Sequence, residues 1–178
     1  MNIQGKHYQS IWEEAGEVYI IDQRKLPHQL VIESLESWEE AATAIRDMYV
    51  RGAPLIGATA AYGLYLAAKA APEDAQEYIE RAARFLGETR PTAVDLFFAL
   101  QGSLKVIAQA SGKAAKTAAA LQYAKDFAQT SADHCHAIGK HGLELIRAIA
   151  KNKPGEPVNI LTHCNAGWLA CIDYGTAT

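Results

Sequence analysis

The sequence is poor in cysteine, in long apolar runs and in any excess of one charge. Its three cysteines are an odd number at irregular spacing, which favours free thiols in a reducing cytoplasm over a disulfide framework. The 17 lysines and arginines are interspersed among 20 aspartates and glutamates, so no basic surface for nucleic acid or an anionic membrane is expected. The longest apolar run, near residues 58–71, contains tyrosines and glycines and is too short to span a bilayer. Because no signal-peptide segment follows Met1, we expect a cytoplasmic protein.

The sequence also lacks the spacing of a metal or dinucleotide site. His134, Cys135 and His136 are adjacent, so on a helix their side chains point in different directions. Zinc ligands on a helix usually lie about three or four residues apart, and ordinary histidines explain this segment better than a metal does. No G-x-G-x-x-G fingerprint is present. These spacings therefore favour neither a metal site nor a dinucleotide site.

The N-terminal part has the pattern of a small antiparallel sheet. Residues 8–12, 18–22 and 28–34 are rich in β-branched and aromatic side chains and are separated by polar turns. The periodicity then becomes helical. Ser37 and Glu40 form a capping box, which predicts a helix that ends near residue 49.

A candidate phosphate cradle follows, with the sequence RGAPLIG at residues 51–57. Gly52 permits a turn that a side chain would block, and Pro54 suits the first turn of a helix over residues 55–71. Arg51 lies beside the free N–H groups of that helix start, and this combination can bind a phosphate. An ordinary helix-turn-helix with a surface arginine fits the spacing equally well.

A second arginine lies close to another expected helix start. A helix over residues 72–87 is followed by Arg90, which precedes a proline and is therefore biased to an extended backbone. Thr92 is the expected N-cap of a helix over residues 93–110. Arg90 and Arg51 could bind one phosphate from two sides.

The C-terminal part places a cysteine between an expected strand and an expected helix. Helical periodicity over residues 114–152 leads, through a turn, to an apolar strand at 157–161 and a helix at 166–171. Cys164 would lie at the carboxyl end of this strand and face helix N–H groups, which favour a reactive thiolate. A small, buried apolar side chain is the alternative role for this residue.

Together these segments predict an α+β, mostly helical protein. Residues 1–112 form an N-terminal domain with a small sheet and helices, and residues 113–152 form a long connecting helical segment, with possible breaks near Ser131, Gly139 and Gly142. Residues 153–178 begin a doubly wound, Rossmann-like domain.

Taken in order, the motifs resemble the methylthioribose-1-phosphate isomerases. The matching stretches read RGAPLIG (51–57), TRPTAVDL (89–96), IGKHG (138–142), LTHCNAG (161–167) and GWLACIDYGTA (167–177). The resemblance implies conversion of 5-methylthioribose 1-phosphate to 5-methylthioribulose 1-phosphate in methionine salvage, without metal or nucleotide cofactor. It also implies a homodimer in the full-length form. By the same resemblance Cys164 is catalytic, and the residues that bind the substrate, chiefly its phosphate, are Arg51, Gly52, Ala53 and Arg90.

The sequence departs from that family downstream of the cysteine. Family members carry an aspartate, an Asn-Lys pair and a glutamine in a second α/β domain, whereas this chain ends at Thr178. Asp173 lies only nine positions after Cys164 and does not match the catalytic aspartate. We therefore expect a truncated chain that lacks half of its active site and is inactive alone.

Two other functions remain open. The regulatory subunits of the eukaryotic translation-initiation guanine-nucleotide exchange factor share the fold and act through protein contacts, but they generally lack the cysteine motif. A related isomerase acts on ribose 1,5-bisphosphate, and the choice between sugars depends partly on residues outside this chain.

Overall fold

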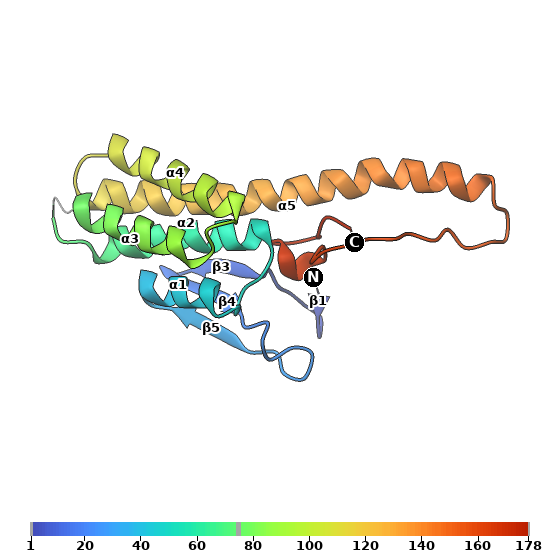
Figure 1. Cartoon of the computed structure of the whole chain (residues 1–178), viewed down its shortest axis with the longest axis horizontal. Helices are drawn as coiled ribbons and strands as arrows, with labels where there is room; N and C mark the ends of the chain where they lie inside the picture. Colours follow the sequence, from blue (N-terminus) through green and yellow to red (C-terminus); the bar gives the residue numbers. More distant parts are fainter. Residues whose placement is uncertain (1, 74–75, 178) are drawn as a thin grey trace.

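The computed structural model describes residues 2–73 and 76–177 and is mostly helical (Figure 1). Its small antiparallel sheets comprise β1 (Asn2–Ile3) with β2 (Lys6–His7), and β3 (Ile11–Glu14), β4 (Glu17–Ile21) and β5 (Ile32–Leu35) in that order. The helices are α1 (Trp38–Arg46), α2 (Ala53–Ala70), α3 (Gln76–Thr89), α4 (Val94–Gln109), α5 (Lys113–Lys151) and the short 3-10 helix η1 (Trp168–Ala170). The predicted α+β, mostly helical class is confirmed.

The hairpin of β3 and β4 turns more tightly than the sequence suggested. Ala15 and Gly16 form its turn with positive φ angles of 54° and 88°. Two residues therefore close the hairpin, and the strands pair to their ends, Glu14 opposite Glu17. The first strand of this sheet consequently lies at Ile11–Glu14 and not at residues 8–12.

The capping box before α1 is present in the structure. The Ser37 hydroxyl accepts the Glu40 N–H at 3.2 Å, and the Glu40 carboxylate accepts the N–H of Glu36, one residue before the cap, at 2.6 Å. The helix ends at Arg46 and not near residue 49. Met48 adopts a φ of 60°, which is incompatible with a continuing right-handed helix.

Helix α2 lies at the centre of the molecule because it is apolar on every side. It is buried from Leu55 to Ala68, with α1 and α3 packed on one side and α4 and α5 on another (Figure 1). Small residues allow close approach: a Cβ placed on Gly57 would lie 2.8 Å from the Phe127 ring and 2.9 Å from the Asp95 carbonyl oxygen. The first turns of α2 and α4 therefore lie together at one end of the helix bundle.

Two predicted helix starts differ in the structure. The helix expected to begin at residue 72 is observed from Gln76, and residues 74 and 75 lie outside the described residues. Thr92 is not the N-cap of α4: Ala93 occupies that position without a side-chain cap. The Ala93 N–H instead donates to the Arg90 carbonyl at 3.0 Å, so a backbone turn precedes the helix.

Helix α5 is continuous over 39 residues. The breaks that were considered possible near Ser131, Gly139 and Gly142 do not occur. Ala120, Ala124, Ala128 and Ala132 are buried against the bundle, whereas the distal half projects beyond it (Figure 1). Within the described ranges, no helix is long and apolar enough to cross a membrane. The division at residues 112 and 152 stays a prediction.

The expected strand and helix around the cysteine motif are not formed. Residues 157–161 form neither a helix nor a strand and pair with no strand of the described chain, and Leu161 is 98% exposed. A strand buried on both faces requires neighbouring strands for its N–H and C=O groups, and none lies here among the described residues. The helix expected at 166–171 is the single turn η1, which the extended backbone of Cys171 ends. The first strand-helix unit of a doubly wound domain is therefore absent from the described part of this structure.

Candidate functional site

The two motifs that the sequence singled out lie against each other. Gly52 caps α2 with a φ of 103°, and a Cβ on it would lie 2.3 Å from the Ala170 carbonyl oxygen and 2.5 Å from the Ala170 Cα. Only a glycine fits at this approach. Ala170 is in η1, six positions after Cys164 in the sequence. The structure thus brings the Arg51–Gly52 turn beside the segment that follows the cysteine (Figure 1).

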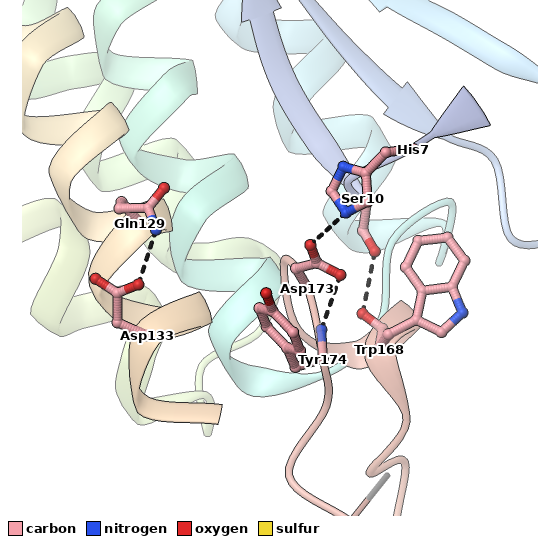
Figure 2. A network of polar contacts seen from close by, with 7 residues as sticks. All are labelled: His7, Ser10, Gln129, Asp133, Trp168, Asp173 and Tyr174. Carbon is pink, nitrogen blue, oxygen red and sulfur yellow. Dashed lines mark hydrogen bonds and ion pairs between the residues drawn. The ribbon is translucent and has the colours of Figure 1, made fainter. Parts of the chain in front are cut away.

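Buried donors that flank strands β3 and β4 hold η1 in place. The Ser10 hydroxyl donates to the Trp168 carbonyl at 3.1 Å, as Figure 2 shows, and the Ser10 N–H donates to the Ile172 carbonyl at 3.0 Å. The Gln23 side-chain amide donates to the Leu169 carbonyl at 2.6 Å. The turn beside Gly52 is therefore fixed by residues far away in the sequence.

A hydrogen bond between His7 and Asp173 holds the residues that follow η1. His7 Nε2 lies 2.7 Å from the Asp173 carboxylate, which also accepts the Tyr174 N–H at 2.9 Å (Figure 2). Burial raises the pKa of Asp173, but hydrogen bonds that include the Tyr174 N–H outweigh it, so this pKa lies below its ordinary value. The Tyr174 ring stacks on His136 of α5 with centroids 4.8 Å apart. Asp173 thus ties the C-terminal segment to β2.

Cys164 is exposed, which excludes the alternative of a small buried side chain in this structure. It has a φ of 86° in an irregular segment, so the predicted position at the end of a paired strand is wrong. Cys135 and Cys171 are buried together, and burial, with the neighbouring Cys135 thiol, raises the pKa of Cys171 to about 12. Among these cysteines, Cys164 is therefore the one that reagents and substrates can reach.

The two predicted phosphate-binding arginines leave guanidinium donors unpaired within residues 2–73 and 76–177. Arg51 is exposed and makes no hydrogen bond or ion pair to the described residues. Arg90 is half-buried, and its Nη1 is fully buried with no hydrogen-bond partner in the same part of the chain. A buried cationic donor without an acceptor is costly, and a bound anion would satisfy it.

The backbone at this end of the bundle adds further donors. Ile56 makes the first hydrogen bond of α2, to the Gly52 carbonyl at 2.9 Å, so the N–H groups of Ala53 and Leu55 precede the helical ladder. Arg90 lies in the connection that leads into α4, whose first turn contacts that of α2 through Asp95 and Gly57. Arginines and helix N–H groups together can hold a phosphate.

The described residues bring together no group of three or more histidine, cysteine or acidic side chains suited to a metal ion. His134, His136 and His141 lie exposed along α5, and Cys135 faces the core. Their side chains point in different directions, because adjacent residues on a helix do not share a face.

Sequence reasoning missed the residues that hold the site together. Gln23 and Ser10 occur in stretches that read as a polar turn and a strand, yet both are buried. His7 and Asp173 meet across 166 positions. A polar residue directly after a strand of apolar residues was the available signal for Gln23, but its partner could not be inferred from the sequence.

Comparisons with known proteins show which proteins this chain is similar to. The methylthioribose-1-phosphate isomerase of Methylocella silvestris is 51% identical over 181 positions, which cover 100% of this chain and 49% of that protein. The solved 5-methylthioribose 1-phosphate isomerase of Pyrococcus horikoshii OT3 superposes with a TM-score of 0.80 at 35% identity, over 96% of this chain and 47% of the other.

A second solved structure, the translation initiation factor eIF-2B subunit delta of A. fulgidus, has the same TM-score of 0.80 at 34% identity, over 95% of this chain and 48% of the other. The chain thus spans about half the length of the proteins it matches. The model of the initiation factor 2 subunit family matches residues 49–172, from just before the Arg51–Gly52 turn to just beyond η1. Both motifs of the site lie inside that match, and the chain belongs to the initiation factor 2 subunit family.

Proposed function

We propose that this chain provides the phosphate-binding and thiol-bearing part of a methylthioribose-1-phosphate isomerase. The close approach of Gly52 to Ala170 carries the proposal. This contact brings the arginine turn (residues 51 and 52) beside the cysteine segment (residues 163–170). The name of the Methylocella silvestris relative supports the substrate. Such an enzyme converts an aldose phosphate into a ketose phosphate within one molecule.

The residue types suit that reaction. The phosphate on C1 blocks ring opening through a free hemiacetal, so an acid must protonate the ring oxygen as its bond to C1 breaks. A base then removes the C2 proton and a proton is delivered to C1, while the C2 hydroxyl gives up its own proton to a base and becomes the carbonyl. In the rival scheme a hydride moves from C2 to C1, and the C2 hydroxyl again loses its proton. Cys164 would exchange the C2 or C1 proton.

The remaining roles fall to the cradle and to residues outside this chain. Arg51 and Arg90 would neutralise the phosphate, while Gly52 and Ala53 would offer it backbone N–H groups. The carboxylic acid that serves the ring oxygen would come from the other half of the relatives' length. For the full-length protein we propose a homodimer. We also propose a cytoplasmic location, because the free cysteines of this chain suit a reducing compartment.

Calorimetric titration of the chain with methylthioribose 1-phosphate tests the proposal. We expect saturable binding that Arg51→Gln and Arg90→Gln each weaken by about tenfold or more, because each removes a charge-assisted contact to phosphate. Cys164→Ala should leave the Kd within about twofold and, in the full-length protein, lower kcat by orders of magnitude.

Two other outcomes would replace this proposal. Tighter binding of ribose 1,5-bisphosphate than of methylthioribose 1-phosphate would assign the related bisphosphate isomerase. Failure of both sugars to bind would leave the cradle without a ligand, as expected for a regulatory subunit that acts through protein contacts.

A further inference from the structure

Gln23 connects the two segments of the candidate site. It directly follows Asp22 after β4 and is 2% exposed. Its backbone N–H donates to the Tyr49 carbonyl at 2.9 Å, two positions before Arg51. Its side-chain amide donates to the Leu169 carbonyl at 2.6 Å, five positions after Cys164. One buried residue is therefore hydrogen-bonded to the chain on both sides of the site.

The surroundings of Gln23 make it a rigid support. Asp22 is buried and accepts three hydrogen bonds from the Arg24 guanidinium, at 2.8, 2.9 and 3.2 Å. The same guanidinium stacks on the Tyr49 ring, 3.1 Å from its centroid. Tyr49 is thus held by its ring and by its carbonyl. The segment that leads to Arg51 cannot shift without breaking these contacts.

We propose that Gln23 is a positioning residue, which keeps the arginine turn and the cysteine segment in one fixed relation. This inference rests on the proposed function, because it assumes that one ligand contacts both segments. Without the side-chain amide, the Leu169 carbonyl loses its donor and η1 loses its direct link to the Tyr49 segment. The arginines and the thiol would remain, but they would no longer be held for the same ligand.

Ser10 provides the matched control for this role. Its hydroxyl also donates to a carbonyl of η1, that of Trp168 at 3.1 Å, and it is equally buried. It makes no bond to the Tyr49 segment among its described contacts. Ser10→Ala therefore removes one hydrogen bond from the same turn without removing a bridge between the two segments.

The test measures how a sugar phosphate protects Cys164 from iodoacetamide, a reagent for which this exposed thiol is the accessible one. Saturating methylthioribose 1-phosphate should slow alkylation of the unmodified chain by about tenfold or more. Gln23→Met, which keeps the length of the side chain but cannot donate, should reduce the protection to less than about twofold. Ser10→Ala should retain most of it. Full protection in Gln23→Met would overturn the inference.

A second variant and a ligand-free measurement keep the inference separate from the proposed function. Gln23→Glu preserves the shape of the side chain but presents an acceptor to the Leu169 carbonyl. It should therefore reduce the protection of Cys164 as much as Gln23→Met does. In amide hydrogen exchange, either variant should accelerate residues 166–171 and leave residues 49–56 unchanged, because the Gln23 N–H still donates to the Tyr49 carbonyl. Unchanged exchange of residues 166–171 in the Gln23 variants would refute the link through the side-chain amide. Absent protection in the unmodified chain, with residues 166–171 accelerated in the variants, would overturn the proposed function alone.

Discussion

At the scale of single residues, Gly52 is the position where the geometry leaves least freedom. Its φ of 103° disfavours any side chain, and the backbone of Ala170 occupies the space of a Cβ. The sequence predicted a turn at Gly52, between two helices, that a side chain would block. The sequence could not show that the space would be filled by residue 170, because that contact depends on the whole fold.

Gly52→Ala should destabilise the chain by about 2–4 kcal/mol, since the positive φ and the overlap with a backbone each add to the cost. Urea unfolding followed by circular dichroism measures this change. Gly112→Ala is the matched control, because Gly112 has a φ of 79° but nothing within 4 Å of a Cβ placed on it, so it should lose only about 1 kcal/mol. Equal losses in the two variants would argue against the contact with Ala170.

Asp22 is a single residue that makes the stability of the folded chain depend on pH. Hydrogen bonds from the Arg24 guanidinium hold the pKa of Asp22 below its ordinary value, against the opposing effect of burial. A carboxyl whose pKa is lower in the folded state stabilises the fold above its unfolded pKa of about 3.9. That stabilisation is lost as the pH falls through the folded pKa.

Asp22→Asn should therefore be less stable than the unmodified chain at pH 7, and the difference should shrink as the pH falls below about 4. Urea unfolding at a series of pH values gives this comparison. Asp47→Asn removes an exposed ion pair with Arg46 and should change stability little at any pH. A difference that stays constant down to the acid limit would show that Asp22 is not stabilised by its charge.

At the scale of elements, helices were predicted better than strands. Local signals such as the capping box at Ser37 and the proline at position 54 define helix starts, and α1 and α2 follow them closely. The strand expected at residues 157–161 needed partners that no local pattern can supply. The apolar pattern there is real, but without pairing it leaves Ile160 65% exposed.

Helix α5 offers a test at this scale in its projecting half. Gly139 lies in a continuous helix with nothing within 4 Å of a Cβ placed on it. Gly139→Ala should stabilise the distal turns by roughly 0.5–1 kcal/mol, because alanine loses less backbone entropy on helix formation. Slower amide exchange over residues 136–150 is the expected result.

The contrasting substitution is Gly57→Ala in α2, whose new Cβ would lie 2.8 Å from the Phe127 ring. It should destabilise the bundle by about 1–3 kcal/mol, since the packed core has no room to relax. If both substitutions were stabilising, helix propensity and not packing would govern α2.

At the scale of the whole molecule, the candidate site depends on contacts between distant parts of the chain. Residues that flank strands β3 and β4 hold η1, and η1 in turn fills the space beside the start of α2 (Figures 1 and 2). The cradle residues Arg51 and Arg90, and the thiol of Cys164, were predicted from local chemistry and a family resemblance. The support from Gln23, Ser10 and His7 was not, because buried polar pairs have no local sequence pattern.

The central claim is that the arginine turn and the cysteine segment form one binding site for a sugar phosphate. Amide NMR spectra of the chain, titrated with methylthioribose 1-phosphate, test it most directly. We predict that the N–H signals of Gly52, Ala53 and Leu55 shift together with those of residues 163–170, and that both groups give one Kd. Shifts confined to one group, or different Kd values for the two, would contradict the claim.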